Sequence, residues 1–181
     1  DYTGHLAVLC LALALVARPL CKVMPGLLRS RRVLGVSAFG LAVAHVGHLV
    51  SMGWDLAALP FLLPPLQVGT WAGIAGLTLL VPLAGTSFDW AQQRWGDRWR
   101  WLHLLGIPAF VLVVLHVILL GSHYLGAMVW TWQNWAATVA LGSVALGVLL
   151  LRQRWIWTVL LLDRLYGVPL KAEAVASNHE Q

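Results

Sequence analysis

The sequence predicts an all-α integral membrane protein, a bundle of five transmembrane helices plus a short C-terminal interfacial helix. Hydrophobic residues make up 60% of the 181 residues and charged residues only 10%, whereas a soluble domain carries about 25% charged residues. The mean hydropathy of +0.78 agrees. Helices are expected because they satisfy their own backbone hydrogen bonds in lipid. The formal charge of +5 does not indicate nucleic acid, because the basic residues cluster beside apolar runs.

Segments that cannot cross a bilayer separate the first three predicted spans. The first span runs from about Gly4 to Leu20, with Pro19 near its end, and a basic loop closing at Arg32 follows it. The second runs from about Val33 to Met52 and meets a loop that contains three prolines. The third runs from about Val68 to Thr86 and is followed by a loop of mixed charge.

Two further spans complete the predicted bundle. The fourth runs from Arg98 to Gly121, and the fifth runs from about Asn134 to Leu151, after an uncharged loop. The apolar run from Trp155 to Leu162 is too short to cross and predicts an interfacial helix. Residues 1–170 are therefore expected to form one membrane domain, followed by a polar tail over residues 171–181.

The basic residues predict how the bundle lies in the membrane. All twelve Lys and Arg fall in the first loop or at its edge, in the third loop or in the C-terminal part. Five alternating spans bring these segments to one side, which the positive-inside rule makes cytoplasmic. We expect a bacterial inner (plasma) membrane protein with its N-terminus outside and its C-terminus cytoplasmic. The eleven tryptophans gather near the span ends, as an interfacial belt does.

Histidines inside two of the spans indicate chemistry. Lipid offers imidazole no hydrogen-bond partner, so an ionisable residue there is a functional candidate. Counted from the basic ends of their spans, His45 and His116 fall at comparable depth on parallel helices. That arrangement suits a b-type haem, whose iron takes axial imidazoles. His103 lies nearer the basic side and is a third candidate. His48, one turn beyond His45, is an alternative ligand or a contact for a haem propionate.

Two features qualify the pattern. On an ideal helix, thirteen residues place His103 and His116 about 140° apart, so the two rings would not share one face. Pro108 lies between them and can kink the helix. The remaining histidines, His5, His123 and His179, are near the predicted surface or the termini and are expected to be solvated or interfacial.

Three blocks of sequence resemble a known family. The stretch RRVLGVSAFGLAVAH, from Arg31 to His45, is similar to the RRxLG…F…H segment of the MsrQ/YedZ family, the haem-binding membrane subunit of the methionine sulfoxide reductase system. Tyr-Thr-Gly at residues 2–4 is a second match. The third is a block with Thr86-Ser87, Gly96, Trp99, Leu102 and His103, followed thirteen residues later by His116. The resemblance covers residues 1–124 and places the chain in the wider ferric-reductase-like transmembrane group.

The resemblance implies a set of cofactors, ligands and partners. It makes His45, His103 and His116 the expected ligands of one or two b haems. It places Arg32 at an inner face where an anionic flavin such as FMN could dock. It implies a cytoplasmic flavin reductase or quinol as electron donor and a periplasmic reductase subunit as acceptor. The broader oxidase group has a histidine where this chain has Arg31, fourteen residues before His45. The family also has a span before the Tyr-Thr-Gly motif, which this sequence lacks, so either an upstream segment is missing or the chain differs from the family there.

The leading prediction is therefore an electron-transfer subunit of an oxidoreductase system, in which the cofactor carries the redox step. One alternative is the membrane component of a ferric or oxygen reductase with a separate flavin subunit, since the chain contains no Gly-rich nucleotide motif. Another is a structural subunit of a larger membrane complex, whose histidines only bond neighbouring helices.

Overall fold

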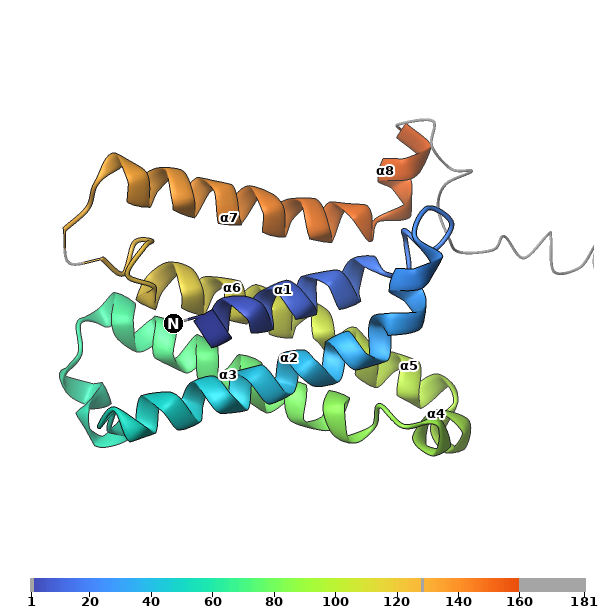
Figure 1. Ribbon diagram of the computed structural model, residues 1–181, viewed down its shortest axis with the longest axis horizontal. Coiled ribbons are helices and arrows are strands. Elements are labelled where there is room, and N and C mark those ends of the chain that lie inside the picture. The colour runs from blue at the N-terminus through green and yellow to red at the C-terminus, as the bar shows by residue number, and fades with distance from the viewer. Residues whose placement is uncertain (1, 128, 160–181) are drawn as a thin grey trace, which may run out of the picture.

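The computed structural model describes residues 2–127 and 129–159, and every regular element within these ranges is a helix. Figure 1 shows the long helices lying side by side along one axis. Within the described residues, four segments are long and apolar enough to cross a membrane: α2 (Pro25–Ser51), α3 (Pro64–Gly85), the α5–α6 segment (Asp97–Leu120) and α7 (Trp132–Leu151). These findings confirm the all-helical membrane protein, with four candidate spans.

The first helix, α1, is shorter than its predicted span. It covers Tyr2–Val16, about 22 Å at 1.5 Å per residue, whereas the hydrocarbon core is about 30 Å thick. Pro19 explains the early end, because it has no N–H for the carbonyl of Leu15. The Arg152 guanidinium donates to that carbonyl instead, at 3.2 Å. Nε of Arg31 likewise donates to the carbonyl of Ala14, at 3.3 Å.

The second helix begins earlier than predicted. Pro25 occupies its first turn, where a residue without an N–H costs the helix nothing. The basic residues assigned to the first loop, Arg29, Arg31 and Arg32, therefore lie on the first two turns of α2. The prediction that they form a loop was wrong, because Pro25 starts the helix before the basic residues are reached.

The fourth predicted span is divided into α5 (Asp97–Leu104) and α6 (Gly106–Leu120). Pro108 explains the break, since its missing N–H leaves the carbonyl of Leu104 without an intrahelical donor. Short helices lie between or beyond the spans. They are the 3₁₀ helix η1 (Leu56–Phe61), α4 (Asp89–Trp95) and α8 (Arg154–Val159). The rest of the predicted interfacial helix, the polar tail and His179 lie outside the described residues.

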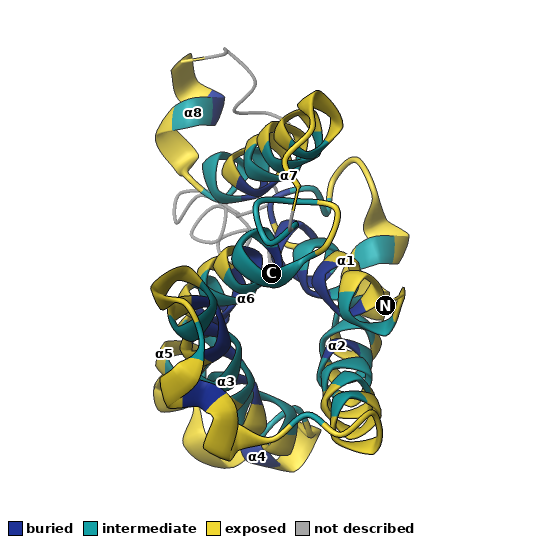
Figure 2. Ribbon diagram, turned by 90° about the vertical axis from the view of Figure 1, so that its left-hand side faces the viewer, coloured by how far each residue is buried: buried dark blue, intermediate teal, exposed yellow. Residues whose placement is uncertain are grey.

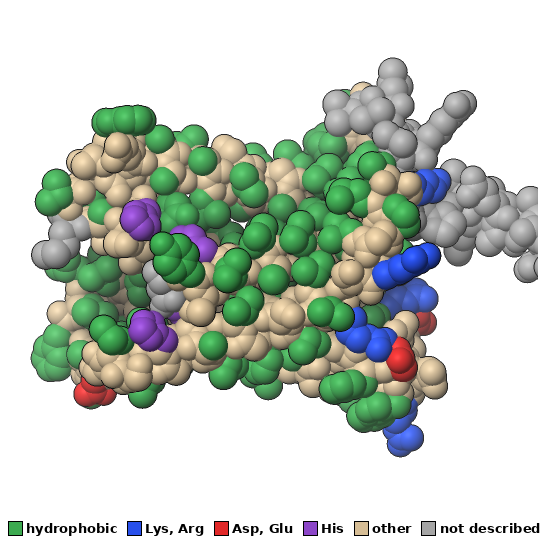
Figure 3. Space-filling model, in the orientation of Figure 1, with side chains coloured by type: hydrophobic (Ala, Val, Ile, Leu, Met, Phe, Trp, Pro, Cys, Tyr) green, Lys and Arg blue, Asp and Glu red, His purple; other side chains and the backbone are tan. Residues whose placement is uncertain are grey.

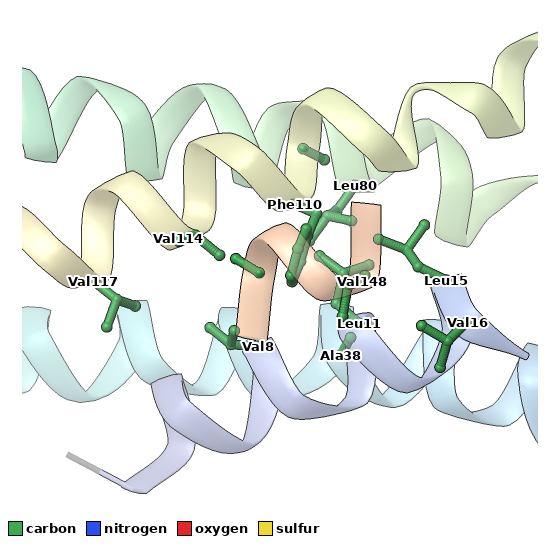
Figure 4. Packing of buried hydrophobic residues seen from close by; sticks show 12 residues of the cluster. Val8, Leu11, Leu15, Val16, Ala38, Leu80, Phe110, Val114, Val117 and Val148 are labelled. Carbon is green, nitrogen blue, oxygen red and sulfur yellow. The ribbon is translucent and has the colours of Figure 1, made fainter. Parts of the chain in front are cut away.

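The helices form two tight pairs, α1 with α2 and α3 with α6. In the end-on view of Figure 2 these pairs stand on opposite sides, and α7 covers α1 and α6. The buried core lies where α1, α6 and α7 meet, around Leu11, Phe110 and Val148 (Figure 4). Phe110 is only 1% exposed. This packing joins the two pairs through α1 and α6, and so positions the histidine-bearing helices α2 and α6.

The two ends of the bundle differ in chemistry. In Figure 3, Lys and Arg side chains gather at the end where α4 and α8 lie, and histidines gather toward the opposite end. We call these the basic end and the histidine end. The segregation is what the loop charges predict for a helical membrane protein.

Candidate functional site

The imidazoles of His45 and His116 meet between two helices. His45 lies on α2 and His116 on α6, and their ring centroids are 6.1 Å apart with the ring planes at 84°. Both side chains are half-buried. The two residues are 71 positions apart in the chain, so the contact depends on how the two helix pairs stand against each other.

Helix α3 holds the ring of His116. Nδ1 lies 2.9 Å from the backbone carbonyl oxygen of Gly69, which fits the tautomer in which Nδ1 donates its proton. That tautomer leaves the Nε2 lone pair for a metal, and a carbonyl partner of this kind is typical of metal-ligating histidines. The ring rests directly on Gly73, where an added Cβ would stand 2.4 Å from Nδ1. Only glycine at this position lets the ring lie so close to the backbone of α3.

Helix α1 packs beside the ring of His45. Gly4 faces the imidazole, and a Cβ added there would lie 3.4 Å from its Nδ1. The Tyr-Thr-Gly motif therefore places α1 beside the ring, at a distance where an added methyl group would be in ordinary van der Waals contact with it. His5, the next residue, stacks on Tyr124 with ring centroids 5.8 Å apart.

The spacing of the two rings suits two axial ligands of one iron. Two metal–imidazole bonds of about 2 Å each, plus half a ring on either side, place the ring centroids roughly 6 Å apart. The observed 6.1 Å agrees. Two imidazoles fill only the axial positions of an iron, and the four nitrogens of a porphyrin fill the others. The residues present therefore fit a bis-histidine haem.

His103 occupies a second environment, at the basic end. Its ring stacks on Trp99 at 3.9 Å between centroids, and its Nδ1 lies 3.1 Å from the Trp99 carbonyl oxygen. The indole of Trp99 is fixed in turn, since its Nε1 donates to the carbonyl of Thr86 at 2.7 Å. Nε2 of His103 is buried. Besides the Trp99 carbonyl, the backbone of Leu83 on α3 also lies within hydrogen-bonding reach of the ring.

A cavity of about 510 Å³ opens beside His103, within the usual range of ligand sites. Leucines of α1 and α3 form its apolar wall, and arginines of α2 line its outer part. Arg31 is fixed there by its bond to α1. Arg32 pairs with Asp89 of α4. The hydrogen bond from the Arg32 guanidinium holds the pKa of the Asp89 carboxyl below its usual range.

The other predicted residues lie apart from these two places. His48 is exposed one turn beyond His45, and His123 is exposed beyond the end of α6. Sequence reasoning missed Gly73, and it named Trp99 only as part of the family motif, without a role beside His103. A signal for the first existed, because Gly69, Gly73 and Gly76 form a small-residue stripe at helical spacing, which predicts close helix packing.

Comparison with known proteins identifies the family. The family described as "Ferric reductase like transmembrane component" matches residues 3–114, a range that contains His45 and His103. The heme-binding subunit MsrQ of a protein-methionine-sulfoxide reductase from Ralstonia nicotianae is 32% identical over 166 residues, 86% of this chain and 69% of the relative. The chain belongs to the MsrQ family of ferric reductase-like membrane proteins.

Other relatives match over shorter parts. MsrQ of Cronobacter sakazakii is 31% identical over 129 residues, 65% of this chain and 60% of the relative. The magnetosome protein MamZ of Paramagnetospirillum magneticum is 33% identical over 134 residues, which are 67% of this chain and 20% of that protein. The chain thus spans about three fifths of the length of the Cronobacter MsrQ. No solved structure matches this MsrQ-family chain.

Proposed function

We propose that this chain is a transmembrane electron-transfer subunit that holds a b-type haem between His45 and His116. The observation that carries the proposal is the 6.1 Å separation of two imidazoles from different helices, with one of them oriented by a backbone carbonyl. The names of the relatives support it, since they are heme-binding subunits of protein-methionine-sulfoxide reductases.

A second haem, at the basic end, would take His103 as an axial ligand. The cavity beside His103 supports this assignment. His103 and His116 are thirteen residues apart, about 20 Å along the helix. Two haems would then stand at two depths, which suits stepwise electron transfer across the bilayer.

When bound, the haem supplies reversible one-electron chemistry between ferric and ferrous iron. The chain supplies geometry and environment. Gly69 keeps the proton of His116 on Nδ1, and Gly73 lets α3 close against the ring of His116. The apolar core around Phe110 excludes water from the space beside them. No residue of the site needs to make or break a bond of a substrate.

The distribution of basic residues determines which end of the bundle faces the electron donor in this proposal. In this proposal the basic end is cytoplasmic and α1 completes a five-span bundle. Electrons enter there from a flavin reductase or a quinol. Arg32 and its neighbours give this face the charge to attract an anionic flavin such as FMN. The chain itself lies in the bacterial inner membrane. Electrons leave it at the histidine end and pass to a methionine sulfoxide reductase subunit in the periplasm.

Proteoliposomes test the proposal directly. The haem-loaded chain is placed in vesicles that contain ferricyanide, and a membrane-impermeant reductant is added outside. We expect internal ferricyanide to be reduced by the wild type and by the control His123→Ala, and not by His45→Ala or His116→Ala. Equal rates in all four proteins would refute the assignment. Supplying a methionine sulfoxide reductase subunit or an Fe(III) chelate as acceptor separates the leading function from a ferric reductase.

A further inference from the structure

A hollow of about 590 Å³ lies at the basic end, where α4 meets α5. Its lining residues are Arg94, Trp95, Arg98 and Leu102. None of them lines the cavity beside His103. The turn between the two helices is Gly96, whose φ of +51° is a left-handed conformation that favours glycine. Because of this turn, α4 runs across the direction of the long helices (Figure 1), and the two arginines reach the same hollow.

The hollow carries two positive charges that the neighbouring acids do not balance. The acidic residues of α4 and of the start of α5 are both engaged elsewhere, Asp89 with Arg32 and Asp97 with Arg100. Within residues 2–127 and 129–159, no acidic side chain forms an ion pair with Arg94 or Arg98. Two guanidinium groups at one concave place are suited to a phosphate, which they can bind with paired hydrogen bonds.

The rest of the lining is apolar and aromatic. Trp95 borders the hollow and is 42% exposed, and Trp101, on α5, is 74% exposed. Tryptophan at this level marks the headgroup region of a bilayer. Leu102 lies at the start of the apolar run that crosses the membrane and extends the hollow toward hydrocarbon. A partner with a hydrocarbon part next to its negative charge, as a phospholipid has, would match both sides of the hollow.

We propose that this hollow binds the headgroup of an anionic phospholipid in the leaflet at the basic end. The guanidinium groups of Arg94 and Arg98 hold the phosphate, Trp95 lies at the level of the glycerol, and Leu102 contacts the first part of an acyl chain. The proposal does not depend on the haem, since none of these four side chains lines the cavity beside His103. The proposed partner of α4 and the start of α5 is therefore a lipid that is already present in the membrane.

Native mass spectrometry of the purified chain tests the proposal. Phosphatidylglycerol and phosphatidylcholine with the same acyl chains are compared, and inorganic phosphate is a third arm. We expect tight binding of phosphatidylglycerol only. Arg94→Gln and Arg98→Gln should each weaken it about five-fold, and the double variant about thirty-fold. Arg154→Gln, an exposed arginine at the same end, is the matched control and should bind as the wild type does.

Several results would overturn the proposal. One is a double variant that retains the wild-type affinity for phosphatidylglycerol, and another is equal binding of the two lipids. Inorganic phosphate that competes at equal concentration would indicate a free-anion site. A polyglutamate peptide whose binding depends on the two arginines, with lipid binding unchanged, would assign the hollow to an acidic protein. Arg94→Lys with Arg98→Lys provides a second variant, expected to bind at an intermediate affinity if the double glutamine variant loses its helicity.

Discussion

The ring of His116 lies directly against Gly73 of α3, so the Gly73→Ala variant is an informative test of the histidine site. An added Cβ would stand 2.4 Å from Nδ1 and 2.8 Å from Cε1 of the ring. Both separations are well inside van der Waals contact. The imidazole must therefore move off α3, and the 2.9 Å contact of Nδ1 with the Gly69 carbonyl is lost or lengthened.

The size of the effect follows from two known costs. Inserting a methyl group into a packed interior costs about 1–3 kcal/mol. Removing the outer partner of a metal-ligating histidine lowers metal affinity about 10- to 100-fold. Because the displaced ring loses both its position and its orienting bond, we expect the affinity of the apoprotein for haem to fall by about 10- to 100-fold.

Haem titration followed by absorbance measures this affinity, and circular dichroism checks that the variant remains helical. Gly85→Ala is the matched control, because Gly85 lies on the same helix and an added Cβ meets nothing within 4 Å. The control should bind haem as the wild type does. A helical Gly73→Ala protein with wild-type affinity for haem would refute the role assigned to the ring of His116.

Three further predictions concern other parts of the chain. Trp99→Leu removes the stack on His103 and should shift the midpoint potential of a haem bound there, whereas Trp99→Phe should shift it less; equal potentials in a redox titration would contradict the role of the stack. Pro108→Ala supplies the missing N–H, so the amide at position 108 should become protected in hydrogen exchange, and an unprotected amide would show that other residues set the break. The lowered pKa of Asp89 means that its pair with Arg32 stabilises the fold above the unfolded pKa of about 3.9 and is lost as the pH falls through the lower folded pKa. The difference in melting temperature between the wild type and Arg32→Gln should therefore be small, because both side chains are exposed, and should vanish in strong acid.

Much of the histidine site could be predicted by counting residues. The depth of a side chain in a span follows from its distance from the basic end, and this alone pairs His45 with His116. The apolar runs likewise indicate the long helices. These features depend on local sequence and on a bilayer of known thickness.

Other features depend on distant contacts that no local pattern records. The end of α1 is one example, since the Leu15 carbonyl accepts from Arg152, 137 residues away. The position of Arg31 is another. Its place fourteen residues before His45 suggested a missing ligand, whereas the structure shows its guanidinium bonded to the carbonyl of Ala14 at the end of α1. The orientation of Trp99 is a third example, since its indole Nε1 donates to the carbonyl of Thr86, thirteen residues earlier in the chain.

The central claim is that two imidazoles, from α2 and α6, bind the same iron. Low-temperature electron paramagnetic resonance of the oxidised, haem-loaded protein measures this most directly, because two imidazole ligands make ferric haem low-spin and one imidazole alone leaves it high-spin. For the haem between His45 and His116, we expect a low-spin signal in the wild type that is replaced by a high-spin signal in both His45→Ala and His116→Ala. The same low-spin signal in the wild type and in both variants, at equal haem content, would contradict it.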